Sequence, residues 1–374
     1  WSVNGNILVP KEACGKGGSW KNTDWWLALF LLLECWHERV REALHGPIHS
    51  YSFRLNGWDT RVWDHAWGNR IALFLQEWIS RNKGTSRSSV FGPLPNCNIQ
   101  LSFDVDAISK TLPIRFKQSI FNCFNAARLA LRFRPITAMQ RLRKAFRFLW
   151  GNENWWTFGR IFELTQDIEP KPIFNFCATS QLGLKSWIMD PGYDLHDPKL
   201  QCLFKKIESR SYIIGLHPSF DSWNDESVLI KEKDRLEIAA GVQVKSARQH
   251  WLRFSWEHTW KSQEKAGLKE DTTLMFNDRP GFRNSSALRW NPWDPTSQAK
   301  TKIISKPTIL MDSHLFDYGL LTPAKRKDSI SKLIQESVLV GGVCCVLWHP
   351  HTLARDYGWQ ADFEVLLKEL NKLK

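Results

Sequence analysis

The chain has 374 residues and a formal net charge of +13, with 51 Lys and Arg against 38 Asp and Glu. A hydrophobic content of 43% and a charged content of 24% are those of a soluble globular protein, and no apolar run reaches the ~18 residues that a membrane span requires. The length allows a full core and two domains, and the positive charge favours an anionic partner such as nucleic acid, a lipid surface or an acidic glycan.

The first hundred residues predict a small α+β domain. Residues 25–44 and 63–80 have the spacing of amphipathic helices, and residues 50–53 favour a short strand between them. A stretch rich in Gly, Ser, Pro and Asn, which is typical of a linker, ends at residue 98. We therefore expect an N-terminal accessory domain over residues 1–98 and a second domain over residues 99–374.

The second domain alternates predicted strands with predicted helices. The clearest strand is residues 101–106, where apolar residues alternate with Ser102, Asp104 and Asp106. Further strands are expected at residues 172–177, 212–216, 308–311 and 343–348, and helices at residues 107–150, 155–165, 227–240, 256–266, 325–338 and 361–373. Because strands that alternate with helices form parallel sheets, we expect an α/β fold with a parallel sheet or barrel.

Two carboxylates lie at the end of the first of these strands. The period of a strand places Asp104 and Asp106 on one face, at the end where parallel α/β folds carry their chemistry. Two negative charges this close repel each other unless a cation lies beside them. One carboxylate is then a candidate metal ligand and the other a candidate general base. The alternative is a strand followed by an Asp-rich turn.

Two later strands end at a histidine. His217 follows residues 212–216, and its imidazole is a candidate ligand for zinc, with Asp221 four residues on as a possible carboxylate ligand. His349 follows residues 343–348, and a histidine is the side chain best suited to pass a proton near neutral pH. For both, the alternative is a structural histidine that only makes hydrogen bonds.

The segment 248–254 adds an arginine and another imidazole. Arg248 could hold a carboxylate through a two-pronged hydrogen bond and keep it ionised, and His250 is a further candidate metal ligand. Candidates for contact with a substrate are Arg253, Asp271, Arg283 and Trp348. The alternative for these four is that they lock loops or fill the core. Taken together, the carboxylates, imidazoles and arginine suit metal-assisted hydrolysis.

The chain resembles the polysaccharide deacetylase (NodB-like) family in five motifs that follow the family's order. They are Ser-Phe-Asp-Val-Asp at 102–106, Gly-Leu-His-Pro-Ser-Phe at 215–220, Arg-Gln-His-Trp-Leu-Arg at 248–253, Ala-Gly-Leu-Lys-Glu-Asp-Thr-Thr at 266–273 and Leu-Trp-His at 347–349. The resemblance covers about residues 99–374. It looks closest to a bacterial branch with a His-Pro-Ser-Tyr-like second motif and an extra N-terminal domain.

The resemblance implies a distorted (β/α) barrel, a divalent metal, usually Zn²⁺, and removal of N-acetyl groups from an amino sugar in a polysaccharide or lipid-linked glycan. The roles it implies are general base for Asp104, metal ligand for Asp106 and His217, brace of the base for Arg248, and general acid for His349. The family commonly has a second His where this chain has Asp221, so either His250 or Asp221 must complete the metal site, and we favour His250. The alternative is a catalytically degenerate barrel that binds glycans or acts as a scaffold.

A basic segment runs from Lys110 to Arg147, with no Asp or Glu between residues 107 and 150. Its cations are Lys110, Arg115, Lys117, Arg128, Arg132, Arg134, Arg141, Arg143, Lys144 and Arg147. Apolar residues alternate with them, which predicts a helix that contacts an anionic membrane or a lipid-pyrophosphate substrate, or else a solvated helix face. Nucleic acid ranks last, since only the net charge favours it. The eight scattered Cys predict reduced thiols in a cytoplasmic protein, peripheral at the membrane if this segment binds lipid.

Overall fold

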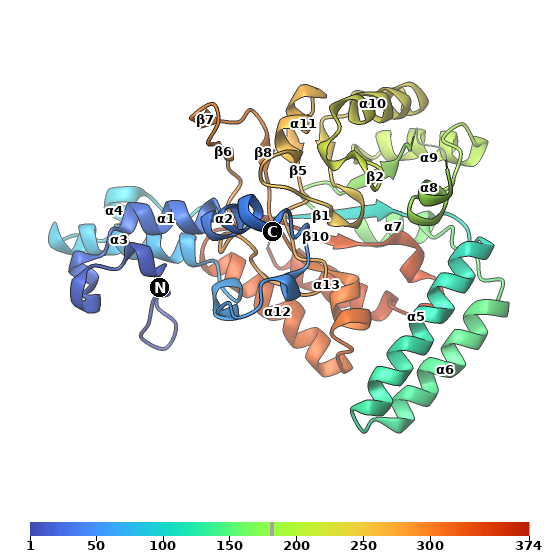
Figure 1. Ribbon diagram of the computed structural model, residues 1–374, viewed down its shortest axis with the longest axis horizontal. Helices are drawn as coiled ribbons and strands as arrows, with labels where there is room; N and C mark the ends of the chain where they lie inside the picture. The colour runs from blue at the N-terminus through green and yellow to red at the C-terminus, as the bar shows by residue number, and fades with distance from the viewer. Residues whose placement is uncertain (180–182, 374) are drawn as a thin grey trace.

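The computed structural model describes residues 1–179 and 183–373, and its centre is an eight-stranded sheet (Figure 1). The strand order is β8-β5-β4-β3-β2-β1-β10-β9, and every neighbouring pair is parallel. The strands are β1 Asn98–Val105, β2 Ile173–Cys177, β3 Ile213–His217, β4 Ser246–Ala247, β5 Glu270–Asp271, β8 Ile304–Ser305, β9 Thr308–Met311 and β10 Val343–Trp348. A separate antiparallel pair joins β6 Trp293–Asp294 to β7 Ala299–Lys300.

The sheet curls toward a barrel. Its two edge strands, β8 and β9, follow each other directly in the chain, with only Lys306 and Pro307 between them. Because consecutive Cα atoms are ~3.8 Å apart, the two edges must lie close together. The expected α/β fold with a distorted parallel barrel is therefore confirmed.

Helices cover the outside of the sheet (Figure 1). In the barrel region they are α5 Leu112–Leu131, α6 Pro135–Trp150, α7 Phe158–Thr165, α8 Leu184–Met189, α9 Pro198–Glu208, α10 Glu226–Ala240, α11 Thr259–Lys265, α12 Pro323–Leu339 and α13 Gln360–Asn371. In the N-terminal region they are α1 Trp25–Leu33, α2 Trp36–His45, α3 Trp67–Asn82 and α4 Arg87–Phe91. Among the residues that the structure describes, none of these helices is both long and apolar enough to cross a bilayer.

The N-terminal region differs from the sequence-based expectation in three places. The helix expected over residues 25–44 is two helices, because Cys35 adopts a left-handed backbone conformation with φ of 43° between α1 and α2. The strand expected at residues 50–53 is instead a turn of 3-10 helix at Ser52–Arg54. The expected linker before residue 98 contains the short helix α4. The spacing of apolar residues does not predict the break at Cys35, because no Gly or Pro, the usual signals of a helix end, lies there.

Buried ion pairs join the N-terminal helices to the barrel region. Glu38 of α2 lies 2.8 Å from Arg283, and Arg70 of α3 lies 2.6 Å from Glu336 of α12, with all four side chains nearly inaccessible to solvent. Residues of the N-terminal region, including Leu73, also belong to the main hydrophobic core of the barrel. The two regions thus share a core, and the domain boundary at residue 98 stays a prediction.

Candidate metal centre

The strands of the sheet bring ionisable side chains to one end of the barrel. Because all eight strands are parallel, their carboxyl ends lie on the same side of the sheet. The residues at or directly after these ends are Asp104, Asp106, His217, Arg248, Asp312 and His349. The predicted convergence of side chains that are far apart in the chain is therefore present in the fold.

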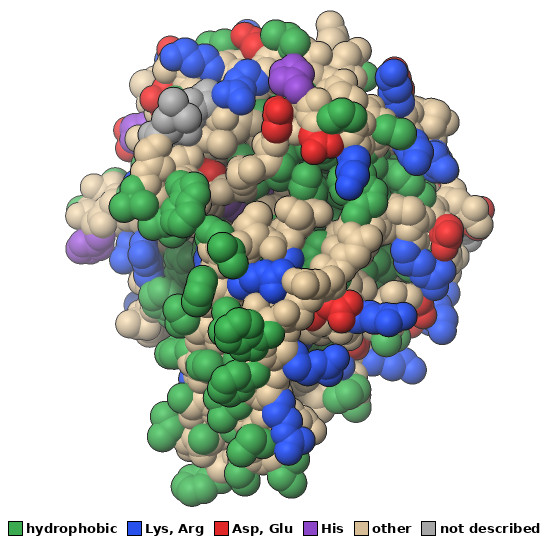
Figure 2. All heavy atoms as spheres, turned by 90° about the vertical axis from the view of Figure 1, so that its right-hand side faces the viewer, with side chains coloured by type: hydrophobic (Ala, Val, Ile, Leu, Met, Phe, Trp, Pro, Cys, Tyr) green, Lys and Arg blue, Asp and Glu red, His purple; other side chains and the backbone are tan. Residues whose placement is uncertain are grey.

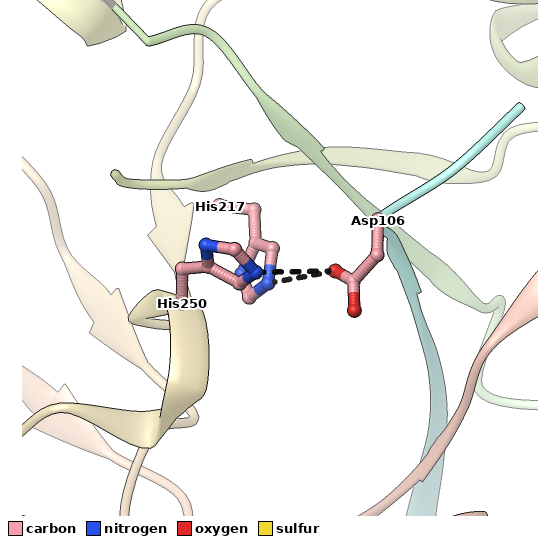
Figure 3. A group of neighbouring side chains, drawn as sticks. All are labelled: Asp106, His217 and His250. Atoms are coloured by element: carbon pink, nitrogen blue, oxygen red, sulfur yellow. Dashed lines mark ion pairs between the residues drawn. The ribbon is translucent and has the colours of Figure 1, made fainter. Parts of the chain in front are cut away.

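Three of the predicted ligands form one group (Figure 3). The ligand atoms of Asp106, His217 and His250 all lie within 4.8 Å of one another. Asp106 Oδ1 is 3.2 Å from His217 Nε2 and 3.9 Å from His250 Nε2, and Figure 3 shows both rings directed at this carboxylate. Such spacing allows all three atoms to bind a single cation.

The hydrogen bonds at the far side of each ring leave the Nε2 atoms as acceptors. His217 Nδ1 lies 2.5 Å from the carbonyl oxygen of Arg248, and a carbonyl can only accept, so this Nδ1 carries a hydrogen. His250 Nδ1 donates in the same way to Asp190 Oδ1, 3.0 Å away. In the neutral rings each Nε2 then presents a lone pair toward Asp106, whose buried Oδ1 has no well-aligned hydrogen-bond donor among the described residues.

Two imidazole lone pairs and a carboxylate oxygen that face one another repel unless a positive charge lies between them. This donor set is the one that Zn²⁺ binds in catalytic sites, where a fourth position is left for water. The two outer hydrogen bonds also fix the ring orientations that metal-bound histidines require. The residues present therefore fit a divalent metal.

The pKa shifts show how strongly these groups depend on one another. Burial alone would raise the pKa of Asp106, but His349, His217 and His250 outweigh it and hold that pKa below its ordinary value. Burial lowers the pKa of His250, while Asp104 and Asp106 overcome burial at His217 and raise its pKa. A positive charge in this place is thus strongly favoured, either as a proton on His217 or as a metal ion.

Asp104 is held next to this group by two donors. Arg248 Nη1 lies 3.1 Å from Asp104 Oδ1, and Asn175 Nδ2 donates to the same oxygen at 2.8 Å. The other oxygen, Oδ2, lies 3.8 Å from His217 Nε2, on the side of the candidate metal site. Burial opposes ionisation of Asp104, but the nearby charge of Arg248, with His217 and His349, lowers its pKa. The carboxylate is therefore ionised and available to accept a proton.

His349 lies on the other side of Asp106. Its Nε2 is 3.4 Å from Asp106 Oδ2, and its Nδ1 is 2.7 Å from Asp312 Oδ1. Asp312 is fully buried and also accepts hydrogen bonds from the His349 backbone N–H and from the hydroxyl of Thr352. Burial would lower the pKa of His349, but Asp312 and Asp106 raise it to about 10, so the imidazole is protonated near neutral pH.

The structure corrects the expectation that Asp221 is a metal ligand. The Asp221 carboxylate is paired with Arg253 at 3.1 Å and with Lys185, and it is not part of the metal-ligand group. The alternative favoured from the sequence, His250, occupies that place. Arg253 itself is partly exposed and stacks over the rings of Phe220 and Trp223, so it stays a candidate for substrate contact.

Three of the expected substrate contacts are wrong, because the side chains are inside the protein. Asp271 is fully buried and accepts hydrogen bonds from Trp260, Gln263 and Thr273. Arg283 is buried in the ion pair with Glu38, and Trp348 is buried in the core. A sequence motif marks such residues without showing whether they face solvent or another side chain.

Sequence reasoning assigned no role to three residues that hold the site together. Asp190 accepts a hydrogen bond from His250, Asn175 donates one to Asp104, and Asp312 accepts one from His349. Asp312 could have been found, since it directly follows a predicted strand. Asn175 lies inside β2, where an amide among apolar residues is the only signal, and Asp190 lies in a loop without any periodic pattern.

No protein-family description and no curated protein matches the sequence. Among solved structures, one from Mycobacterium smegmatis, provisionally named a polysaccharide deacetylase, is 17% identical over 75% of this chain and 85% of that chain, with a TM-score of 0.44. A wild-type CE4 family pseudoenzyme from Bacillus anthracis is 11% identical over 75% of this chain and 62% of that chain, with a TM-score of 0.34. A 4-alpha-glucanotransferase from Thermococcus litoralis is 11% identical over 74% of this chain and 37% of that chain, with a TM-score of 0.41. Likenesses of this degree carry no argument about activity.

Proposed function

We propose that this protein is a metal-dependent hydrolase that removes N-acetyl groups from an amino sugar in a polysaccharide or a lipid-linked glycan. The observation that carries the proposal is the convergence of Asp106, His217 and His250 on one point, beside a carboxylate and an imidazolium that are each held by a second charged residue. A site with these groups has a metal position, a base and an acid within one small volume.

The base and the acid have the protonation states that amide hydrolysis needs. Asp104 is ionised, and its Oδ2 faces the ligand group, where it can take a proton from an attacking water. The neighbouring Asp312 carboxylate favours the protonated form of His349, whose Nε2 lies 3.4 Å from Asp106 Oδ2, where it can give a proton to the departing nitrogen. Arg248 donates a buried hydrogen bond to Asp104, and Asp312 accepts one from His349. These two contacts hold the base and the acid in their orientations and favour their charged forms.

The reaction balances with these groups alone. Water adds its oxygen to the acetyl carbon, the bond between that carbon and the sugar nitrogen breaks, and acetate and a free amine are released. One proton passes from the water to Asp104, and one passes from His349 to the amine. The acetic acid formed loses its proton to solvent as acetate, and return of the Asp104 proton to His349 through solvent restores both groups. A bound divalent metal, for which we propose Zn²⁺, would polarise the acetyl oxygen and lower the pKa of the water.

The substrate class rests on the motif resemblance and on the exposure of the candidate ligand group. Asp106 keeps a side chain that is 29% exposed, so the ligand group is open to a molecule from outside. Arg253 stacks on the Phe220 and Trp223 rings and keeps a partly exposed guanidinium, which can donate hydrogen bonds to the hydroxyl groups of a sugar. An amino-sugar residue of a glycan is therefore the substrate that we propose.

The experiment is a release assay for acetate from N-acetylated chitin oligosaccharides, peptidoglycan and N-acetylated exopolysaccharide. We expect release by the zinc-loaded protein, loss after treatment with a chelator, and recovery when metal is restored. The variant Asp104→Asn should bind metal as the wild type does and should release no acetate. Metal binding without acetate release from any of these substrates would favour the alternative, a degenerate barrel that binds glycans. Absence of metal binding would contradict the proposed metal site and, with it, the proposed metal-dependent hydrolysis.

A further inference from the structure

Helices α5 and α6 form a hairpin that extends away from the barrel (Figure 1). They pack against each other along their length, with Asn122 and Ala126 among the buried residues of α5, and Leu129 packs with Ala138 of α6 and with Leu320 of the barrel region. The turn between the helices is at residues 132–134, at the far end of the arm from the sheet. The outer surface of the hairpin is therefore available to a partner.

Cations at the base and in the middle of the hairpin fix it to the barrel. Lys110 forms a buried ion pair with Asp356 at 2.8 Å, and Arg141 pairs with Asp317 at 3.3 Å. Lys144 donates to the backbone oxygen of Tyr357. These cations stabilise the position of the arm and are not available to a partner, although the sequence alone placed them on the same basic surface.

The outer surface of the arm is apolar to an unusual degree. On α5, side chains spaced mostly by four residues line one side of the helix, and on α6 a second group lies alongside. They are Leu112, Phe116, Ile120, Phe124 and Leu131 on α5, and Ile136, Met139, Phe146 and Trp150 on α6, each more than half exposed. At the turn, Phe133 is 94% exposed. Figure 2 shows these hydrophobic side chains gathered along the projecting arm. Isolated exposed apolar residues are ordinary, but a continuous surface of this kind indicates a binding face.

Cations of the hairpin flank this apolar surface, and the hairpin itself has no acid. Arg132 and Arg134 lie on either side of Phe133, and Arg143 and Arg147 lie on α6, all exposed. None of these four forms an ion pair with any residue in the ranges 1–179 and 183–373. Between residues 107 and 150 there is no Asp or Glu.

From this combination we infer that the α5–α6 hairpin docks on an anionic lipid bilayer, with Phe133 and its apolar neighbours in the interface and the four arginines on the lipid phosphates. A basic amphipathic surface with Phe, Trp and Leu is the type that lies in the headgroup region of a membrane. A second copy of this chain is a poor partner, because two such hairpins in contact would repel each other: both carry Arg residues and neither carries a carboxylate.

The test is co-sedimentation of the full chain with vesicles of phosphatidylglycerol and phosphatidylcholine, next to vesicles of phosphatidylcholine alone. We expect binding to the anionic vesicles, weakened by salt, and much less binding to the neutral ones. Removing the apolar tip with Leu131→Ser and Phe133→Ser should lower the partition coefficient by at least about tenfold. The double variant Arg132→Glu and Arg134→Glu should lower it by about fivefold or more for each side chain.

The matched control is a pair of changes on α10, a helix outside the hairpin: Arg235→Glu and Ile238→Ser, both at exposed positions. This variant should bind vesicles as the wild type does. All these side chains are exposed, so folding should persist, and circular dichroism melting checks that it does. The inference is overturned if the wild type does not bind anionic vesicles, binds neutral ones equally, or loses binding equally in the control. A concentration-dependent dimer that Phe133→Ser abolishes, without vesicle binding, would overturn it in favour of self-association. No outcome depends on catalysis.

Discussion

His250 and Asp221 are the two residues between which the sequence left the third metal ligand open, and they make a direct test. We expect His250→Ala to weaken the affinity for Zn²⁺ by at least about a hundredfold, because one of three ligand atoms is lost. We expect Asp221→Ala to leave that affinity unchanged, because the Asp221 carboxylate pairs with Arg253 and Lys185. Competition against a chromophoric chelator measures both. Equal weakening in the two variants would contradict the assignment.

His314 predicts a loss of stability in acid. Its Nδ1 accepts a hydrogen bond from the Met311 backbone N–H, and its Nε2 donates to the Phe276 carbonyl, so the ring fits its place only when neutral. Burial lowers its pKa to about 4, below the ordinary 6.5. Between pH 6.5 and 4 the unfolded chain then binds more protons than the folded one. Stability must therefore fall as the pH is lowered through this window.

The expected loss from His314 is roughly 3 kcal/mol of unfolding free energy over that window, at 1.36 kcal/mol for each pKa unit. Urea unfolding at pH 7 and pH 4 measures most of it. In His314→Asn, whose amide oxygen can still accept from Met311, the overall stability should be lower and the acid-dependent part smaller. An unchanged acid-dependent part in that variant would assign the effect to other groups.

At the level of the strands, a glycine in β3 makes room for the residue that holds the base. Gly215 pairs in register with Asn175, and a Cβ at Gly215 would lie 2.2 Å from Asn175 Oδ1. The Asn175 amide donates to Asp104, so an added methyl group would displace the base indirectly. We expect Gly215→Ala to lower kcat for acetate release by about tenfold to a hundredfold, while metal affinity is retained.

Gly159, in α7, is the matched control for that change. A Cβ at Gly159 meets nothing within 4 Å, so Gly159→Ala should leave kcat unchanged. A circular dichroism melt of both variants separates a local shift of Asp104 from general unfolding. If Gly215→Ala kept the full rate, the close packing between β2 and β3 would not position the base.

Periodicity was sufficient for the long elements and for the ends of long strands. β1 alternates polar with apolar residues, whereas β3 and β10 are mostly apolar. The ionisable residues at the ends of these strands were correctly expected to lie together. β4, β5 and β8 have two residues each, too few to show any period. The strand expected at residues 50–53 failed for a similar reason, since four residues cannot outweigh tertiary contacts.

Burial was the property of the site that could not be predicted. Trp348, Asp271 and Arg283 have residue types that often contact sugars, but each is enclosed by partners from distant parts of the chain. A sequence does not state which partner closes over a side chain. The proximity of the candidate metal ligands was predictable because strand direction alone brings them to one end of the sheet.

At the scale of the whole molecule, the buried pair between Glu38 and Arg283 tests whether residues 1–98 are an independent domain. Both side chains are 1% exposed, and Glu38 also accepts a hydrogen bond from Trp256 in the barrel region. Removing one partner of a buried ion pair leaves the other charge uncompensated, at a cost of about 3–5 kcal/mol. We expect Glu38→Gln to lower the unfolding free energy by this amount.

Hydrogen exchange shows where that loss is felt. If the two regions unfold as one unit, the slowest amides of β1 and β10 in the barrel should exchange at least about a hundredfold faster in Glu38→Gln, because they exchange through global unfolding. The control is Asp59→Asn, which breaks the exposed pair with Arg61 and should cost less than ~1 kcal/mol. Faster exchange confined to α1, α2 and α3, with β1 and β10 unchanged, would instead support separate domains and a boundary near residue 98. The shared core that contains Leu73 and the barrel strands leads us to expect the first result.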